Sequence, residues 1–304
     1  MDIFVTGATG FVGSAVVREL LDAGHGVVGL TRSDAGATAL ERAGARPHRG
    51  SLDDPAGLAE AAAASDGVVH TAFDHSFTDY PGAARADLAV IEAVGAALAG
   101  SGKPFVVTSA TGLAARPGHV TVETDRADPE GHAAVRAPSE YATLALADRG
   151  VRSVALRLPQ VHGEGDRLGF VPRILTAART RGVSAYVGEG DNVWPAVHRD
   201  DLARLYLLAV EDGDTVRPGT VLHGVAEEGI AFRDLATAGG RRLGVPVASI
   251  AADGAGEHFG WLAGFAVMDN ATSSDATREL TGWAPTGPTL LEDLEAGWYD
   301  DAQV

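Results

Sequence analysis

The chain has no cysteine, which excludes disulfides, thiolate catalysis and cysteine-ligated metals. It has a single lysine, Lys103, so chemistry that needs a lysine anywhere else has to use another residue. No run of about 18 apolar residues occurs, and we expect no membrane span. Basic clusters are also missing from a chain of formal net charge −17, which argues against a nucleic-acid partner.

What is present is the composition of an ordinary globular protein. Apolar residues make up 45% of the 304 residues and charged residues 21%. This length is enough for one large or two unequal domains. Residues 1–13 have the pattern of a strand and a turn rather than the charged-then-apolar order of a signal peptide. We therefore expect a cytoplasmic enzyme.

A glycine-rich turn follows the first apolar run. The β-branched and apolar residues from Ile3 to Val5 lead into three glycines spaced by two residues, and an amphipathic run over 14–21 follows. Strand, glycine turn and helix in this order predict a dinucleotide site, because the backbone can approach a pyrophosphate and the helix start offers free N–H groups. The residues expected to contact the cofactor here are Gly7, Thr9, Gly10, Phe11, Val12 and Gly13.

Strands and helices alternate through the first half of the chain. Buried runs such as 67–72 and 104–108 predict strands covered on both faces, which is typical of a doubly wound parallel α/β sheet of the Rossmann type. Ligands in such sheets bind beyond the carboxyl ends of the strands. Strands are expected at 2–6, 26–31, 45–49, 67–72, 104–108 and 153–157, and helices at 11–23, 34–43, 55–64, 83–99 and 138–148.

The second half is less regular. We expect a helix over 171–181, an exposed Gly- and Asp-rich loop over 188–195, and a tail over 270–300. The resulting division is a dinucleotide-binding domain at 1–160 and a mainly substrate-binding α+β region at 161–304. That region is built from C-terminal insertions, with some segments returning to the sheet.

Six segments resemble the short-chain dehydrogenase/reductase superfamily, in its extended and atypical, epimerase/dehydratase-like branches. The resemblance spans most of the chain, and six segments in this order are specific. They are TGATGFVG at 6–13, GSLDDP at 50–55, VVHTAF at 68–73, VVTSAT at 106–111, LRLPQVHGEGD at 156–166 and WPAVHRDDLARL at 194–205.

The end of the second strand predicts the cofactor. NAD-binding members place an acid there for the ribose 2′-hydroxyl, but this chain has Arg32 and Ser33, which suit a 2′-phosphate. We therefore expect NADP(H). The resemblance implies that adenine lies near Ser51 and Leu52, although Ser51 replaces the family's Asp. It also implies cofactor contacts at Ala72, Phe73, Thr108, Pro159 and His162.

The expected catalytic pair is absent. The family uses Tyr-x-x-x-Lys, in which the tyrosine donates a proton and the lysine lowers its pKa and holds the nicotinamide ribose. Matching the family's glutamate to Glu140 puts Arg136 at the lysine position and His132 at the tyrosine position. The alternative alignment matches Ser139-Glu140 to the family's usual Ser-Lys, which puts Arg136 at the tyrosine position and Glu140 at the lysine position. We favour the first alignment, because it keeps the acid, places a cation where ribose contact is needed and nearly preserves the spacing to Arg149-Gly150. His132 is then a candidate proton donor, since histidine titrates near neutral pH and can donate a proton without a lysine.

Several alternatives stay open around this segment. Pro138 favours a helix that begins there, which leaves His132 and Arg136 in a loop, and Arg136 can instead pair with Glu140 at i,i+4. Tyr141 is the nearest tyrosine but lies out of register. The resemblance implies that a hydroxyl holds the substrate carbonyl, and Ser109 or Thr111, which follow the fifth expected strand, can supply it.

Two further groups of side chains are candidates for ligand binding, one for a metal and one for the substrate. Asp74, His75 and Asp79 have metal-ligand types without a further ligand set, so no metal is expected. Aromatic residues can line an apolar pocket, and the segment from His258 to Trp261 is expected near its mouth, where it would accept a ring-containing small molecule.

The leading interpretation is an NADPH-dependent oxidoreductase that reduces a carbonyl or activated double bond of an apolar small molecule. Its proton would come from His132, a tyrosine or a water. The alternatives are an NADP(H)-binding sensor or scaffold without turnover and, less favoured, an NAD-dependent sugar-nucleotide epimerase or dehydratase. Alanine-rich faces on the helices at 83–99 and 138–148 predict a homodimer.

Overall fold

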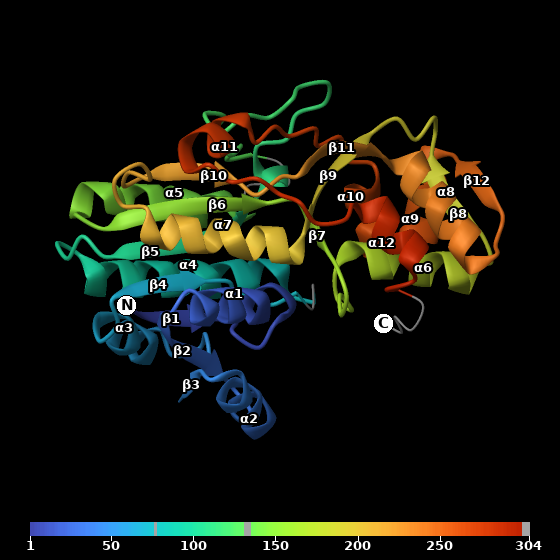
Figure 1. Ribbon diagram of the computed structural model, residues 1–304. Helices are drawn as coiled ribbons and strands as arrows, with labels where there is room; N and C mark the ends of the chain where they lie inside the picture. Colours follow the sequence, from blue (N-terminus) through green and yellow to red (C-terminus); the bar gives the residue numbers. More distant parts are fainter. Residues whose placement is uncertain (76–77, 131–134, 300–304) are drawn as a thin grey trace.

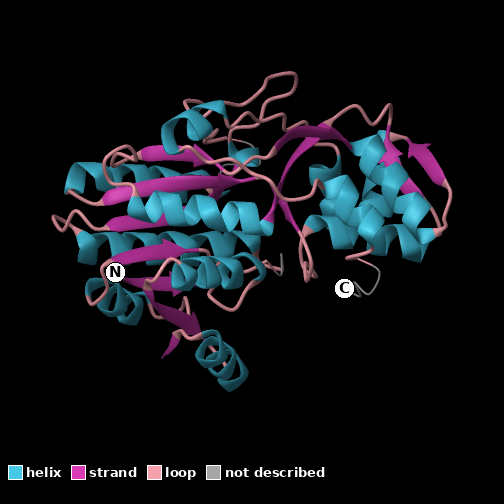
Figure 2. Cartoon of the chain, viewed as in Figure 1, coloured by secondary structure: helices cyan, strands magenta, loops and turns pink. Residues whose placement is uncertain are grey.

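The computed structural model describes residues 1–75, 78–130 and 135–299. Among these residues, seven parallel strands form one sheet in the order β10-β6-β5-β4-β1-β2-β3 (Figures 1 and 2). This is the Rossmann-type α/β sheet that the alternation of apolar runs predicts. The strands are β1 (Asp2–Thr6), β2 (Gly26–Thr31), β3 (Arg46–Arg49), β4 (Gly67–His70), β5 (Pro104–Ala110), β6 (Arg152–Leu158) and β10 (Thr220–His223).

Helices cover both faces of the sheet. Because side chains alternate along a strand, Ile3 and Val5 pack towards α1 and α7, whereas Phe4 packs towards α3 and α4. The two resulting cores explain why these strands read as continuous apolar runs. The helices of this part are α1 (Phe11–Asp22), α2 (Asp34–Ala43), α3 (Pro55–Ala63), α4 (Tyr80–Leu98), α5 (Ala137–Ala145) and α7 (Arg199–Glu211).

A second part lies beyond the carboxyl ends of β5 and β6 (Figure 1). Its core contains Trp194, Phe232 and Phe259, which pack edge to face. The strands are β7 (Gln160–His162), β8 (Ser184–Val187), β9 (Val193–His198), β11 (Glu227–Ala231) and β12 (Val247–Ile250). The helices are α6 (Phe170–Arg181), α8 (Phe232–Leu243), α9 (Ala255–Phe259), α10 (Ala263–Ala266) and α12 (Leu290–Ala296). Helix α11 (Asp275–Thr281) lies instead beside β10 of the large sheet (Figure 1).

Two expectations for the second half are corrected. The segment 188–195 is not an exposed loop throughout, because β9 begins at Val193 and Trp194 is only 2% exposed. The apolar run from Val193 to Val197 outweighs the Gly and Asp residues before it. The segment 270–300 contains α11 and α12 rather than a plain tail.

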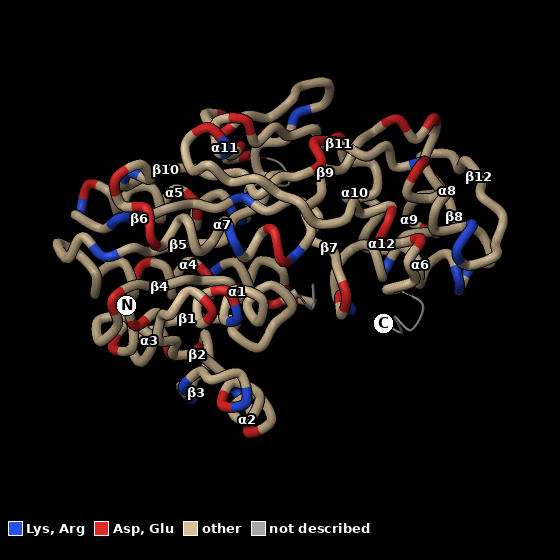
Figure 3. Tube along the Cα trace, in the orientation of Figure 1, with Lys and Arg blue, Asp and Glu red and all other residues tan. Residues whose placement is uncertain are grey.

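Segments from both sides of residue 160 take part in the large sheet. β10 pairs with β6, and α7 packs on α1, so segments from the second half complete the sheet. The domain boundary itself stays a prediction. Asp and Glu are spread over both parts rather than gathered on one element (Figure 3). None of the described helices is long and apolar enough to cross a membrane.

Candidate active site

The glycine turn has the geometry that a pyrophosphate requires. Gly7 has a φ of +67°, and a Cβ atom at Gly13 would lie 2.1 Å from the Gly7 carbonyl oxygen. Gly10 is the N-cap of α1, and no side chain caps this helix start. The first-turn N–H groups therefore have no side-chain acceptor and are free for an anion.

The loop after β4 lies against this turn. The Ala72 N–H donates to Thr6 Oγ1 at 3.3 Å, and a Cβ at Gly7 would come within 2.8 Å of the Ala72 nitrogen. The structure thus brings together the glycine turn and the segment expected beneath the ribose and pyrophosphate. The described site residues fit a dinucleotide, because a cradle without side chains meets an uncapped helix start.

Arg32 lies just after the end of β2, where a neighbouring carboxylate could compete for its guanidinium. The Arg32 side chain is exposed and has no ion pair within the described ranges. Ser33 caps α2 by accepting a hydrogen bond from the Gly36 N–H at 3.0 Å, while Asp34 pairs with Arg49 at 3.2 Å. The nearest carboxylate in sequence is therefore already paired with an arginine. On the adenine side, the half-buried Ser51 donates to Asp53 Oδ2 at 3.1 Å, next to half-buried Leu52.

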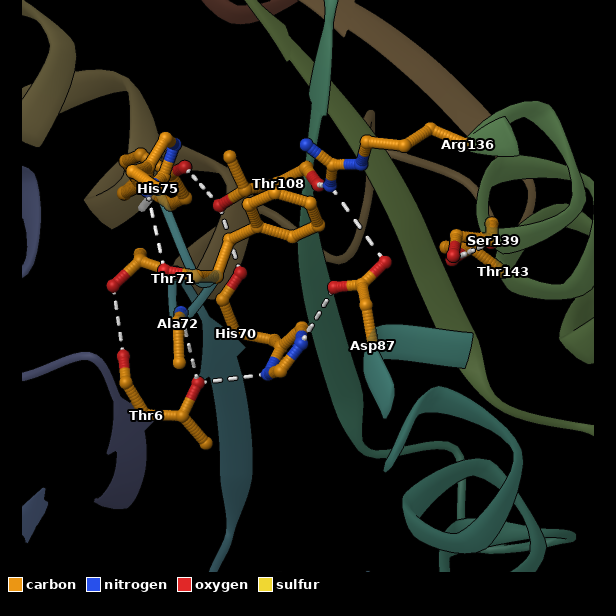
Figure 4. Close-up of polar contacts among 12 residues, drawn as sticks. Thr6, His70, Thr71, Ala72, His75, Asp87, Thr108, Arg136, Ser139 and Thr143 are labelled. Atoms are coloured by element: carbon orange, nitrogen blue, oxygen red, sulfur yellow. Dashed lines mark hydrogen bonds and ion pairs between the residues drawn. The ribbon is translucent and has the colours of Figure 1, made fainter. Parts of the chain in front are cut away.

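Arg136 lies at the carboxyl end of β5, held on three sides (Figure 4). It is the N-cap of α5, and its guanidinium carbon lies 4.1 Å from the centre of the Phe73 ring. Its Nη2 donates to the Thr108 carbonyl oxygen at 3.3 Å and lies 3.6 Å from Asp87 Oδ2. Arg136 Nε is buried and has no partner among the described residues.

A buried chain of polar groups continues from Asp87 to the glycine turn (Figure 4). His70 Nε2 lies 3.2 Å from Asp87 Oδ1, and His70 Nδ1 lies 2.7 Å from Thr6 Oγ1. A neutral His70 that donates from Nε2 accepts at Nδ1 from Thr6. Burial alone would raise the pKa of Asp87, but the His70 hydrogen bond and the Arg136 charge together lower it. Asp87 is therefore a buried carboxylate that faces a cation.

The two candidate hydroxyls are engaged with the protein. Ser109 donates to Glu140 Oε2 at 2.6 Å, and Glu140 forms a buried ion pair with Arg157 at 2.6 Å. Thr111 donates to the Leu158 carbonyl oxygen at 3.4 Å and accepts from Asn270 Nδ2 at 2.9 Å. Both hydroxyl protons point to protein acceptors in this form of the molecule.

Four candidate residues remain, and each of the described ones has its own surroundings. His132 lies outside the described residues. The Tyr141 hydroxyl donates to the Ala127 carbonyl oxygen. Thr108 Oγ1 donates to the His70 carbonyl oxygen at 2.7 Å, and Pro159 is half-buried where β6 ends. Whether these residues act in catalysis or cofactor binding stays a prediction.

His162 belongs to a buried cluster rather than to a solvent-exposed cleft. It is 0% exposed, and its Nδ1 lies 2.6 Å from Asp293 Oδ2. Its Nε2 lies 3.7 Å from Glu227 and forms no hydrogen bond within the described part of the chain. The adjacent His198 ring accepts a hydrogen bond from the Asp200 N–H at 3.3 Å, at the start of α7.

Sequence reasoning missed Asp87. It is 1% exposed on the face of α4 that also carries Ala84, Ile91 and Val94. The sequence signal that could have identified Asp87 is a single acid within an apolar stripe at helical spacing. Unpaired acids are almost never fully buried, so such an acid indicates a buried partner. The possible i,i+4 pair of Arg136 with Glu140 is not formed, since Glu140 turns to Arg157.

Comparison with known proteins gives three findings. Residues 3–223 match the NAD dependent epimerase/dehydratase family. The chain is 46% identical over 300 residues to Schizosaccharomyces pombe protein C2A9.02, covering 98% of this chain and 100% of that protein. It is 34% identical over 236 residues to a Stenotrophomonas maltophilia 2-alkyl-3-oxoalkanoate reductase, covering 74% of this chain and 69% of the reductase.

Solved structures share the fold. The structure of MoeE5 in complex with UDP-glucose and NAD superposes with a TM-score of 0.76 at 23% identity, covering 99% of this chain and 98% of MoeE5. DesIV, a dTDP-glucose 4,6-dehydratase from Streptomyces venezuelae, gives a TM-score of 0.77 at 21% identity, covering 99% and 97% of the two chains. At this level of identity the likeness concerns architecture.

Proposed function

The chain belongs to the NAD-dependent epimerase/dehydratase family, and from this premise we propose that it is an NADPH-dependent oxidoreductase that reduces a carbonyl or activated double bond of an apolar small molecule. The observation that carries this proposal is Arg136, a cation held at the carboxyl end of β5 by Asp87, Phe73 and the Thr108 carbonyl. This is where the resemblance requires a cation for the nicotinamide ribose. The named activity of the S. maltophilia relative, a reductase of oxoalkanoates, supports reduction of a carbonyl.

NADPH is proposed over NADH because of Arg32. When bound, the nicotinamide cofactor supplies the hydride. An exposed guanidinium without a carboxylate partner in the described structure suits a 2′-phosphate, and the Ser33 hydroxyl can donate to it. Asp34 would oppose that phosphate, but Arg49 lies 3.2 Å from Asp34 and offsets its charge. The Gly7 to Gly13 turn would hold the pyrophosphate.

The residues of this chain divide the remaining work. Ser109 gives its proton to Glu140, so its oxygen accepts rather than donates in this form. Arg136 Nε has no partner among the described residues and would donate to the substrate oxygen. His132, at the tyrosine position of the favoured alignment, would supply the proton, with a water or Tyr141 as the alternative donors. Phe73 and the segment from His258 to Trp261 would exclude water from an apolar substrate.

One observation favours a second function, a NADP(H)-binding sensor without turnover. The hydroxyls of Ser109, Thr111 and Tyr141 all donate to protein acceptors, as they would in a binding protein. The third candidate, a sugar-nucleotide epimerase or dehydratase, follows from the family name and from the ligands of MoeE5. Arg32 counts against it, because those enzymes are expected to hold NAD. The absence of the lysine of the Tyr-x-x-x-Lys motif also counts against it.

A titration followed by a turnover assay separates the three. We would follow protein and nucleotide fluorescence with NADPH and with NADH, and then add ketones, aldehydes and enones to the same samples. Tighter binding of NADPH with oxidation on adding a carbonyl supports the reductase. The His132→Ala variant should keep nucleotide binding and lose turnover, and Ser109→Ala should do the same if the Ser109 hydroxyl turns from Glu140 to the substrate oxygen during the reaction. Binding without turnover favours the sensor, and activity only with NAD and a nucleotide sugar favours the epimerase.

We also propose a homodimer through α4 and α5. These two helices pack side by side, with Gly95 of α4 against the Leu146 side chain just beyond α5. Half-buried alanines such as Ala83 and Ala86 would allow the same helices of a second copy to approach closely. Light scattering coupled to size-exclusion chromatography measures the mass, and a mass of one chain would contradict this part of the proposal.

A further inference from the structure

A pocket of about 480 Å³ lies between α6 and the segment from α9 to Leu262. The α6 side of the pocket includes Arg173, Thr176, Ala177 and Thr180, which share one face of the helix at the spacing of successive turns. The pocket therefore runs along α6, for roughly 12 Å between Arg173 and Arg181 at about 1.5 Å per residue. The opposite wall is residues 256–262.

The pocket combines a flat aromatic wall with a cation, Arg173, that forms no ion pair among the described residues, although the charge of the buried Asp166 acts on it. Trp261 is 44% exposed, and the Arg173 guanidinium lies 5.1 Å from its ring centre. Arg173 has no carboxylate within 4.0 Å among the described residues, so its charge is not neutralised by an ion pair there. At the far end, Arg181 pairs with Glu257 at 3.5 Å, so that end carries little net charge.

A neutral hydrogen-bonding group completes the lining. His258 Nε2 is a buried atom without a partner in the described part of the chain. Burial and then the charge of Arg181 lower the pKa of His258, which favours its neutral form. A neutral imidazole with a free ring nitrogen suits an uncharged polar group on a ligand.

A series of side-chain contacts connects this pocket to Arg136. The Arg173 Nη2 donates to the His75 carbonyl oxygen at 3.5 Å, across from α6 to the loop after β4. The His75 ring centre lies 5.2 Å from that of Phe73, which in turn lies beneath Arg136. Trp261, Arg173, His75, Phe73 and Arg136 therefore form one continuous series, from the pocket to the cation of the proposed hydride site.

We propose that this pocket is the outer part of the substrate site and that it selects an otherwise apolar substrate that carries a carboxylate and a flat ring at one end. The carboxylate binds Arg173, the ring packs on Trp261, and the reactive carbonyl extends past His75 towards Arg136. A single negative charge fits better than a diphosphate, because the pocket offers one unpaired guanidinium and Glu257 beside the other. This inference rests on the proposed reductase function.

The test uses matched substrate pairs. The probes are 4-(ω-oxoalkyl)benzoates of increasing chain length, which carry the ring and the carboxylate at one end and the aldehyde at the other, and the corresponding benzamides, which differ in charge but hardly in shape. With NADPH, the wild-type protein should show at least tenfold higher kcat/KM for the carboxylates of one chain length, mainly through KM. The Arg173→Gln variant should lose this preference while its kcat/KM for the amides stays within about twofold. Arg241→Gln, an exposed arginine on α8, is the matched control and should change neither.

Two further variants keep the test decisive. Arg173→Lys retains the charge without the planar fork and should retain part of the preference, which distinguishes loss of charge from loss of fold. Trp261→Ala should raise KM for carboxylates and amides alike, because both use the ring. An equal kcat/KM for the two series, or an equal loss on both in Arg173→Gln, would overturn the assignment.

Failure of the proposed reductase is distinguishable from failure of this inference. If no probe oxidises NADPH, binding of the same probes is followed by tryptophan fluorescence, with Trp261→Phe identifying the signal. Carboxylates that bind at least tenfold more tightly than amides, with the difference lost in Arg173→Gln, support the pocket without turnover. Equal binding of the two series contradicts the pocket whatever the outcome for NADPH.

Discussion

Asp87 Oδ2 lies 3.6 Å from Arg136 Nη2, and the Arg136 side chain is only 11% exposed. Asp87 is 1% exposed, and its other oxygen lies 3.2 Å from His70 Nε2. A buried ion pair of this kind adds little net stability, but it fixes the direction of the arginine. We regard Asp87 as a positioning residue, because it acts on the proposed site only through Arg136.

Replacing Asp87 with Asn should therefore destabilise the protein and weaken turnover. Removing one partner of a buried pair leaves the other charge uncompensated and costs about 3 kcal/mol of unfolding free energy. Because the pKa of Asp87 is lowered in the folded state, its contribution is complete above its unfolded value near 3.8 and declines as the pH falls below it. Denaturant unfolding at pH 7 and near pH 3 should show a large Asp87→Asn deficit at the higher pH and a smaller one at the lower.

The matched control is Asp22→Asn, an exposed acid at the end of α1. It should change stability by less than about 0.5 kcal/mol at either pH. An Asp87→Asn protein with wild-type stability and wild-type kcat would show that Asp87 does not position Arg136.

Arg136 itself should be needed for turnover and only partly replaceable. Arg136→Gln removes the cation and should lower kcat by about 10²-fold, the usual cost of losing one donor to a developing oxyanion. Arg136→Lys keeps the charge and should recover part of this loss. Steady-state kinetics with saturating NADPH measures kcat, and nucleotide fluorescence shows whether the cofactor still binds. A wild-type kcat in Arg136→Gln would remove Arg136 from the mechanism.

Arg32 should decide between the two nucleotides. A hydrogen bond to a charged group contributes about 1.5 to 3 kcal/mol, so Arg32→Ala should raise the Kd for NADPH by about tenfold or more. The Kd for NADH should stay unchanged, because NADH has no 2′-phosphate. Arg42→Ala, another exposed arginine on α2, controls for the loss of positive charge. If both nucleotides weaken equally, Arg32 does not read the 2′-phosphate.

The glycine turn should not tolerate a side chain at Gly13. A Cβ there would lie 2.1 Å from the Gly7 carbonyl oxygen, so Gly13→Ala must displace the turn. We expect a loss of nucleotide binding together with about 1 to 3 kcal/mol of stability. Gly254→Ala adds the same atom where nothing lies within 4 Å and should bind nucleotide normally. Fluorescence titration of both variants checks this, and normal binding by Gly13→Ala would contradict the proposed cradle.

The local parts of this fold could be predicted from the sequence. The six expected strands overlap β1 to β6, because most of these strands are apolar runs, a pattern that depends only on neighbouring residues. The expected helix start near Pro138 also matches, since α5 begins at Ala137 with proline in its first turn. The strands β7 and β11 could not be found this way, because they have three and five residues and pair with segments far away in the chain. The strand β9 is missed because the Gly and Asp residues before Val193 predict a loop.

The partners of the site residues could not be predicted either. Spacing along a helix allows Arg136 to pair with Glu140, but Glu140 faces the sheet and meets Arg157 of β6. Arg136 instead precedes α5 and turns to Asp87, 49 residues earlier in the sequence. Such pairings are decided by which helices the sheet brings together, which depends on long-range packing rather than on local pattern.

Asp166 should make stability depend on pH in the opposite direction to Asp87. It is 3% exposed, and burial raises its pKa from 3.8 to about 6, although the Gly169 N–H donates to it at 2.8 Å. Because the folded pKa is the higher one, the favourable contribution is complete below pH 3.8 and is lost as the pH rises through about 6. A shift of this size corresponds to at most about 3 kcal/mol.

Asp166→Asn keeps an oxygen for the Gly169 N–H and removes the buried charge. It should therefore be more stable than the wild type at pH 7.5 and gain much less at pH 4.5. Asp166→Ala loses the acceptor as well and should not show the full gain. Denaturant unfolding across this pH range measures all three proteins, and a gain of equal size at both pH values would mean that Asp166 does not titrate as its burial requires.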